Sequence, residues 1–227
     1  GTDVRFFEFP AGNWTPKYRL PVDVKVPGYT FLSDMAATPR WFIIGAPAVS
    51  ADGIGASLGK TMPEVLQGDP GGVSTLIFAS RDKNEKKEVT VPIDGVSVEE
   101  FANAFELDEG RRVILDVVVA DSWDVGACWK GDPSQRPRRR LVRYDVDLST
   151  KSFSRQDLCD RHMGFTSVNK AFGGKRHRFV FGAIAHSDSG AGPMAGVAKV
   201  DTDSGEVEAW LPGPTEFGGE PLFVPRD

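Results

Sequence analysis

The chain has 227 residues, which is enough for one large domain or two small ones. Its formal net charge of −5 at pH 7 gives no general attraction to nucleic acid, so no nucleic-acid partner is expected. No apolar run approaches the ~20 residues of a transmembrane helix, so the sequence allows only a peripheral membrane association.

The predicted elements are short strands joined by turns, because 25 glycines and 16 prolines separate short apolar runs. These intervals are typical of an all-β propeller or sandwich. The turns at 149–151 and 203–205 each predict a hairpin, and one short helix is expected at 62–67. In chain order, the strands are predicted at residues 4–9, 23–26, 41–45, 74–80, 88–92, 101–106, 112–120, 141–147, 179–185, 196–201 and 207–211.

The three histidines give no sign of a metal site. His162 and His186 lie in predicted loops, and His177 lies in the basic run 175–178, whose cations would repel a divalent metal. None of them has a partner at the spacing of a known ligand motif. We interpret all three as ordinary surface or loop histidines.

Two other motifs predict no ligand. The glycine-rich run with Lys60 resembles a phosphate loop, but three residues separate Gly55 from Gly59 and five separate Gly53 from Gly59, where the motif requires four. An acidic stretch lacks the glycine and the terminal glutamate of a calcium loop, so we interpret it as a solvated edge. Its members are Glu106, Asp108, Asp116, Asp121 and Asp124.

The basic cluster from Arg136 to Arg143 is interpreted as an exposed loop and a solvated face, with docking to an acidic partner or anionic lipid as the alternative. The apolar loop at 46–66 is the place where a peripheral membrane contact would be made, although a plain surface loop is the simpler interpretation. Cys128 and Cys159 form no metal or redox motif, and nothing in the sequence supports a disulfide between them.

Five segments together resemble the carotenoid cleavage oxygenase family. They are RFFEFP at 5–10, PGYTFLSDMAAT at 27–38, FANAFELDEGRRVILDVV at 101–118, GKRHRFVFGAI with GVAKVDTDSGEVEAWLPG at 174–213, and GGEPLFVPRD at 218–227. The resemblance implies a seven-bladed β-propeller with iron(II) on its axis, held by four histidines that three glutamates orient. In the family the last segment lies mid-chain, so residues 1–227 are expected to form a central portion of the propeller domain.

The residues that the resemblance assigns to iron binding are mostly replaced. Ser33 stands where the family has one histidine ligand, and Glu100 stands where it has a second. Gly164 stands where it has an orienting glutamate, and Glu220 is the one such glutamate retained. The other ligand positions are expected outside the chain. We therefore expect no bound metal or other cofactor and no catalytic residue.

These losses favour a catalytically degenerate protein that acts as a structural or binding subunit, for example in a pigment-containing photosynthetic assembly. Its expected partners are protein subunits that cover open propeller edges, with a carotenoid as a further ligand, and its expected location is the chloroplast. Two alternatives remain open. One is an iron(II)-dependent carotenoid or apocarotenoid cleavage dioxygenase in which Glu100 is an altered ligand. The other is a propeller that binds a carotenoid without cleaving it.

Overall fold

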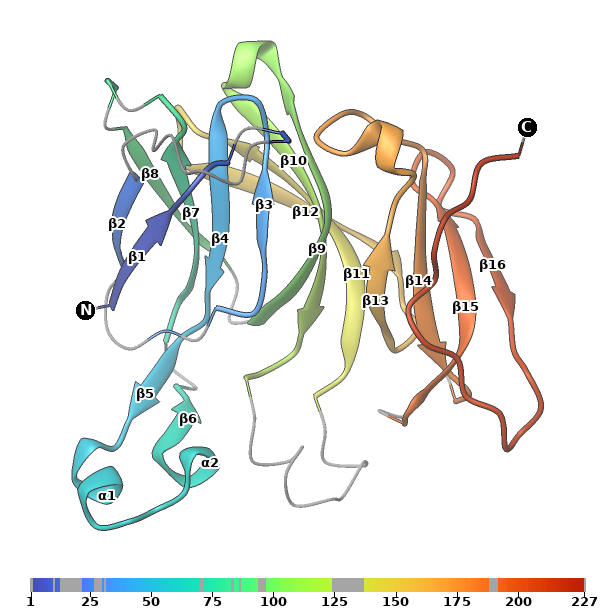
Figure 1. The fold of residues 1–227 in the computed structure, drawn as a ribbon, viewed down its shortest axis with the longest axis horizontal. Helices are drawn as coiled ribbons and strands as arrows, with labels where there is room; N and C mark the ends of the chain where they lie inside the picture. The colour runs from blue at the N-terminus through green and yellow to red at the C-terminus, as the bar shows by residue number, and fades with distance from the viewer. Residues whose placement is uncertain are drawn as a thin grey trace.

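Three four-stranded antiparallel sheets form the body of the computed structural model (Figure 1). In each sheet the four strands lie side by side in the order in which they occur along the chain. The structure describes residues 2–9, 11–12, 22–26, 30, 32–69, 72–82, 84–85, 87–93, 97–123, 137–187 and 192–226. The first sheet contains β3 (Met35–Ala37), β4 (Trp41–Ala46), β7 (Ser74–Ser80) and β8 (Glu88–Ile93). The second contains β9 (Ser97–Leu107), β10 (Arg112–Ala120), β11 (Arg139–Asp147) and β12 (Ser152–Cys159). The third contains β13 (Met163–Ser167), β14 (Phe179–Ala185), β15 (Met194–Asp201) and β16 (Val207–Trp210).

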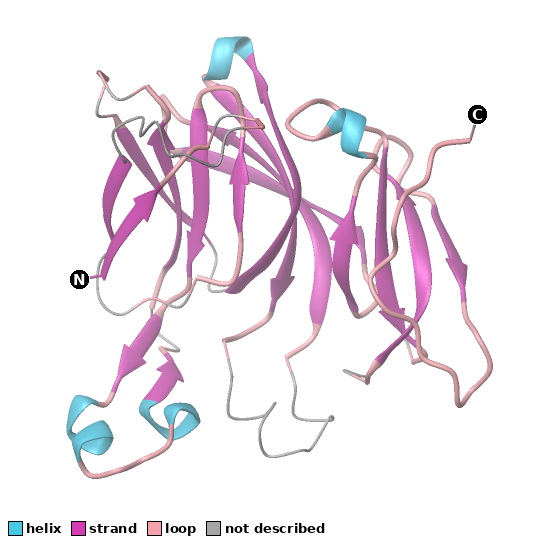
Figure 2. Ribbon diagram, viewed as in Figure 1, coloured by secondary structure: helices cyan, strands magenta, loops and turns pink. Residues whose placement is uncertain are grey.

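Two small ribbons accompany these sheets. β1 (Thr2–Phe6) pairs with β2 (Val22–Val26), and β5 (Val49–Ala51) pairs with β6 (Leu66–Gly68). The second ribbon projects from the first sheet and carries α1 (Gly53–Ser57) and α2 (Met62–Val65), as Figure 1 shows. The 3-10 turns Asp108–Gly110 and Lys170–Phe172 complete the described helices, so helical structure is confined to short connections (Figure 2).

The sequence located most strands, and those at 74–80, 112–120 and 179–185 have the predicted bounds. It missed β3, β5 and β6, because three residues are too few to show a period. It missed β13 because a bulge between Gly164 and Ser167 breaks the alternation. The helix predicted at 62–67 ends at Val65, and α1 was missed because its glycines weaken a helical pattern.

The sheets pack face to face through shared apolar clusters. One cluster joins the first two sheets around Phe78, Leu115 and Tyr144, and a second joins the second and third sheets around Leu141, Met163 and Ile184. A Cβ atom at Gly45 would lie 2.6 Å from Val98 Cβ, so glycine is required where β4 approaches β9. This stacking of neighbouring meanders is the packing of propeller blades.

The basic cluster is not an exposed loop, which corrects the sequence interpretation. Arg139, Arg140 and Arg143 lie on β11, while Arg136 is outside the described residues. Arg138 pairs with Asp160, Arg139 with Glu99, Arg140 with Asp121 and Arg143 with Asp116. Because a carboxylate faces each of these four cations, they offer little uncompensated charge for an acidic partner or lipid.

The projecting loop at 46–66 exposes the apolar side chains of Ile54, Leu58 and Met62. Lys60 pairs with Asp52 at 2.9 Å, and Asp52 also caps α1 by accepting the amide of Gly55. The glycine-rich run therefore forms a capped helical turn that engages its own lysine. In the part of the chain that the structure describes, no helix is long and apolar enough to cross a membrane.

Two hairpin turns are built in the same way around an aspartate. Oδ1 of Asp147 accepts the amides of Ser149 and Thr150 at 2.8 and 3.2 Å, between β11 and β12. Oδ1 of Asp201 accepts the amides two and three residues on at 3.0 and 3.2 Å, between β15 and β16. The hydroxyl of Ser149 lowers the pKa of Asp147 to about 2 by donating to the charged carboxylate.

These turns predict a stability that depends on pH. The hydrogen bond from Arg178 lowers the pKa of Asp201 to about 2, against a usual value of 3.8. Since the folded pKa is depressed, the stability it contributes is present above about pH 4 and is lost as the pH falls toward 2. We expect Asp201→Asn to lower the free energy of unfolding at pH 7, and the difference from the native protein to shrink between pH 4 and 2.

Urea unfolding at pH 7, 4 and 2.5 measures this difference. Asp160→Asn is the matched control, because the Asp160 side chain is largely exposed and should give a small difference at every pH. A difference for Asp201→Asn that did not change with pH would contradict the expectation.

Candidate functional site

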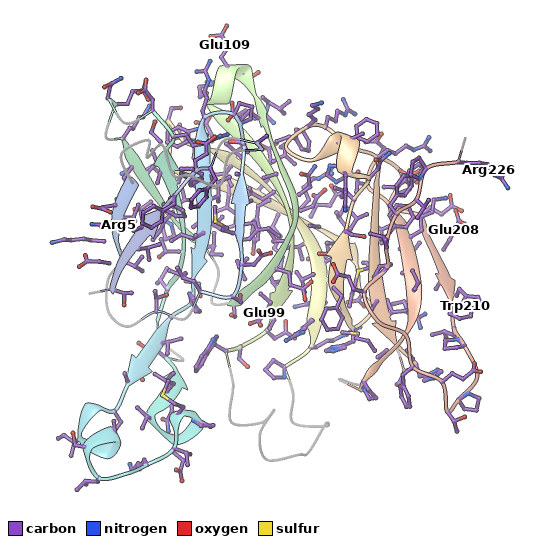
Figure 3. The ribbon with its side chains drawn as sticks, in the orientation of Figure 1. Arg5, Glu99, Glu109, Glu208, Trp210 and Arg226 are labelled. Carbon is purple, nitrogen blue, oxygen red and sulfur yellow. The ribbon has the colours of Figure 1, made fainter. Side chains whose placement is uncertain are left out.

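Three of the positions singled out by sequence come together on neighbouring strands. Ser33 precedes β3, and its hydroxyl donates to the carbonyl oxygen of Glu99 at 2.7 Å. Glu100 is the next residue on β9, near the start of that strand where Figure 3 labels Glu99. Gly164 lies on β13, and a Cβ atom there would stand 3.1 Å from Oε1 of Glu100. Ser33 therefore contacts the residue before Glu100, and Glu100 in turn approaches Gly164.

The carboxylate of Glu100 is held by the bulge in β13. Oε2 of Glu100 lies 3.1 Å from the amide nitrogen of Thr166 and 3.4 Å from its hydroxyl, and both groups donate to it. Thr166 can do this because Phe165 takes φ of 51°, a conformation that L side chains rarely adopt. Strained backbone of this kind persists where its surroundings fix it. Here the bulge turns the Thr166 amide toward Glu100.

A guanidinium lies at the same place. Nη2 of Arg139 is 3.6 Å from Oε2 of Glu99, and Nη1 lies 3.5 Å from where a Gly164 Cβ would stand. Glu99 is an extra residue in the β9–β10 pairing, where the register shifts between Val118 and Val119. Bulges re-aim side chains. Glu100 of β9 and Arg139 of β11 thus both approach Gly164, and Arg139 also pairs with Glu99.

These residues do not fit iron(II). The Ser33 hydroxyl already donates to a carbonyl, and the Glu100 carboxylate already accepts two hydrogen bonds from Thr166. The Arg139 guanidinium would repel a divalent metal bound to the Glu100 carboxylate, because both groups lie beside Gly164. Among the described residues no group of three or more histidine, cysteine, aspartate or glutamate side chains is placed to hold a metal. The described residues at this place are therefore a poor donor set for iron(II).

Glu220, the glutamate that the resemblance retains, has an exposed side chain. Its neighbour Pro221 accepts a hydrogen bond of 2.9 Å from the Ser167 hydroxyl, at the end of the bulge in β13. The GEP segment therefore reaches the same strand as Gly164.

Sequence analysis missed a buried polar network between the second and third sheets. Asp116 is fully buried on β10, and its two oxygens each lie 2.7 Å from a guanidinium nitrogen of Arg143. Nε2 of His177 lies 2.8 Å from Oδ2 of Asp116, and Nδ1 lies 2.8 Å from the amide nitrogen of Asn103. Asn103 also binds three backbone groups of the 172–175 turn and so fixes it beside the network.

The network keeps Asp116 charged. Burial by itself would raise the pKa of this carboxyl, but the hydrogen bonds from Arg143 and His177 outweigh burial and hold the pKa below its usual value. For Arg143, burial would lower the pKa, and the Asp116 carboxylate raises it instead. The acidic stretch is thus no solvated edge at Asp116. Glu106 is also mostly buried and binds the Thr38 hydroxyl at 2.6 Å, and Asp124 lies outside the described residues.

The histidines lie in connections between strands, as predicted, but two of them are not surface residues. His162 is 5% exposed and His177 is 6% exposed. Nδ1 of His162 accepts the amide of Arg139 at 3.2 Å, and the ring of His177 packs edge-on against Phe105. His186 lies after β14 beside Phe217. The basic neighbours of His177 concealed its burial, because they point to solvent while the imidazole turns inward.

Cys159 is buried at the end of β12, in the cluster between the second and third sheets. Cys128 lies outside the described residues, so the structure leaves the absence of a disulfide as a prediction.

Comparisons with known proteins match the whole chain to one family. The family model described as retinal pigment epithelial membrane protein matches residues 1–227. An apocarotenoid-15,15'-oxygenase of Synechocystis sp. is 30% identical over 210 residues, which cover 88% of this chain and 41% of the relative. A chloroplastic 9-cis-epoxycarotenoid dioxygenase of Oryza sativa subsp. japonica is 28% identical over 234 residues, which cover 99% of this chain and 34% of the relative.

Solved structures agree with these matches. A cobalt-substituted form of the Synechocystis ACO protein superposes with a TM-score of 0.83 at 26% identity, covering 93% of this chain and 44% of that one. A chimera of ACO and RPE65 gives a TM-score of 0.84 at 25% identity and 99% coverage of this chain. The fold is therefore the β-propeller of these proteins, and the chain spans less than half the length of the relatives it matches.

Proposed function

Because the chain belongs to the retinal pigment epithelial membrane protein family, with relatives named as carotenoid cleavage oxygenases, we propose that it is a catalytically degenerate member that acts as a structural or binding subunit. The observation that carries the proposal is the polar cluster around Gly164. Oxygen chemistry on iron needs ligands that hold the metal through turnover. Here the Ser33 hydroxyl instead donates to a backbone carbonyl, the Glu100 carboxylate accepts from Thr166, and Arg139 pairs with Glu99.

A pigment-containing photosynthetic assembly in a chloroplast is the setting that we propose. Support comes from several plant relatives, whose names place them in chloroplasts. The exposed apolar side chains of Trp210 on the edge strand β16, and of Leu222 and Val224 in the segment that reaches β13, support partner subunits at the third sheet. A sheet edge with large exposed apolar side chains is a site of association unless another element covers it.

A second candidate is an active carotenoid cleavage dioxygenase with an altered ligand set. Glu100 favours it, because a carboxylate binds iron(II) in other non-haem sites. A third, carotenoid binding without cleavage, is a form of the first in which the ligand is the pigment itself.

Iron content tests the proposal. The natural protein is purified without chelator, its iron is measured by elemental analysis, and its visible absorption is recorded. The Synechocystis apocarotenoid oxygenase, purified in the same way, is the positive control. We expect less than about 0.1 iron per chain, because the donor set lacks two imidazoles. Near-stoichiometric iron would overturn the proposal in favour of the dioxygenase, and a carotenoid band without iron would identify the binding form.

A further inference from the structure

Glu100 and Gly164 are complementary in shape. Oε1 of Glu100 stands 3.1 Å from the position of a Gly164 Cβ, and the Met194 methyl group stands 3.2 Å from it. Such distances are shorter than ordinary van der Waals contact, so a side chain at 164 requires its neighbours to move. Glu100 cannot move freely, because the amide and hydroxyl of Thr166 hold its other oxygen. The absence of a side chain at 164 therefore makes room for the carboxylate of β9.

The charge at this place is also complementary. Glu99 and Glu100 bring two carboxylates to the start of β9, where Ser33 and Thr166 supply only neutral groups. Arg139 faces them from β11, with Nη2 3.6 Å from Glu99 and Nη1 on the Gly164 side. Its side chain is about one third exposed, so its attraction is screened but not abolished. The backbone amide of Arg139 is itself held by buried His162 at 3.2 Å.

We propose that Glu100, Gly164 and Arg139 form an exchanged centre, by which we mean that the Glu100 carboxylate occupies the space that a side chain at position 164 would need. The Arg139 guanidinium supplies the local positive charge. In this centre the second and third sheets are joined by the Glu100–Thr166 hydrogen bonds. Arg139 partly compensates the negative charge of the two glutamates of β9. Position 164 and position 100 are therefore coupled, so that a carboxylate can be carried by one of them but not by both.

This coupling does not rest on the proposed function, since it concerns the packing of the chain in either case. An active protein with iron bound elsewhere would still contain the contact between Glu100 and Gly164. Iron analysis and the experiment below can therefore fail independently.

A double-mutant cycle in the natural protein tests the exchange. Gly164→Glu adds a second carboxylate beside Glu100 and overpacks the site, so we expect its thermal unfolding midpoint to fall by about 5–10 °C. Glu100→Ala with Gly164→Glu moves the carboxylate from β9 to β13 at unchanged net charge. We expect this double variant to regain at least half of the loss. Gly53→Glu is the matched control, because a Cβ at Gly53 meets nothing within 4 Å, and it should change the midpoint little.

An equal loss for Gly164→Glu with and without Glu100 would overturn the proposal. If Gly164→Glu does not fold, Gly164→Ala gives the same cycle with a smaller loss, because its Cβ meets the same two atoms. Arg139→Gln tests the charge balance separately. Its midpoint should fall in the native background and fall less when Glu99→Gln removes the paired carboxylate. An equal fall in the midpoint for Arg139→Gln with and without the Glu99 carboxylate would contradict the role of the guanidinium.

Discussion

Asp116→Asn is expected to lower the free energy of unfolding by about 3–5 kcal/mol, which is the cost of removing one partner from a buried ion pair. The substitution keeps the shape of the side chain and removes its charge. The Arg143 guanidinium is left mostly buried against a neutral group, and Asp116 is fully buried, so water cannot replace the lost interaction. His177, 2.8 Å from the same carboxylate, loses its charged neighbour as well.

Urea unfolding at pH 7 measures the loss. Asp121→Asn is the matched control: it removes the carboxylate that pairs with Arg140 on the same sheet, but this pair is partly solvated and should contribute less than about 1 kcal/mol. A second variant separates charge from packing. Asp116→Leu with Arg143→Met removes both charges, and it should recover much of the stability. Equal losses for Asp116→Asn and Asp121→Asn would show that burial of the pair does not matter.

Phe78→Ala is expected to lower the free energy of unfolding by about 3–5 kcal/mol through loss of buried apolar surface and the cavity that remains. Phe78 on β7 is fully buried in the cluster that joins the first two sheets. Its ring meets Trp41 edge to face, with centroids 6.4 Å apart, so the truncation also removes an aromatic pair. The Trp41 indole is fixed by its hydrogen bond to Gly110, which limits how far it can move to fill the space.

Chemical denaturation of Phe78→Ala and Phe9→Ala compares a buried ring with an exposed one. Phe9→Ala should cost less than about 1 kcal/mol, since little of its surface leaves water on folding. A loss below about 1.5 kcal/mol for Phe78→Ala would indicate that the first and second sheets do not depend on a shared core.

The sequence predicted the long buried strands and failed where tertiary contacts decide. The run Val113 to Ala120 is apolar except for Asp116 and is buried throughout, so composition alone was enough to place β10. β9 extends four residues before its predicted start because Glu99 and Ala102 are extra residues in its pairing with β10, and they break the alternation of a regular strand. No local pattern marks such a bulge, since the partner strand imposes it.

The candidate site divides in the same way. The replaced positions Ser33, Glu100 and Gly164 were located by motif, and the fold brings them together. Arg139 was missed because a cluster of arginines with prolines nearby is typical of a solvated loop. Its pairing with Glu99 depends on two strands meeting across the sheet, and sequence spacing does not contain that information.

The meander order of each sheet has a consequence for how the protein assembles. Among the described residues, each strand of a four-stranded sheet pairs only with the strand before it or after it in that sheet, in chain order. Each sheet needs no later part of the chain to complete its own ladder, so it can form during synthesis once its four strands have left the ribosome. Sequential closure of this kind keeps loop-closure entropy small and favours rapid local folding. Docking of finished sheets through their shared clusters would then be the slower step.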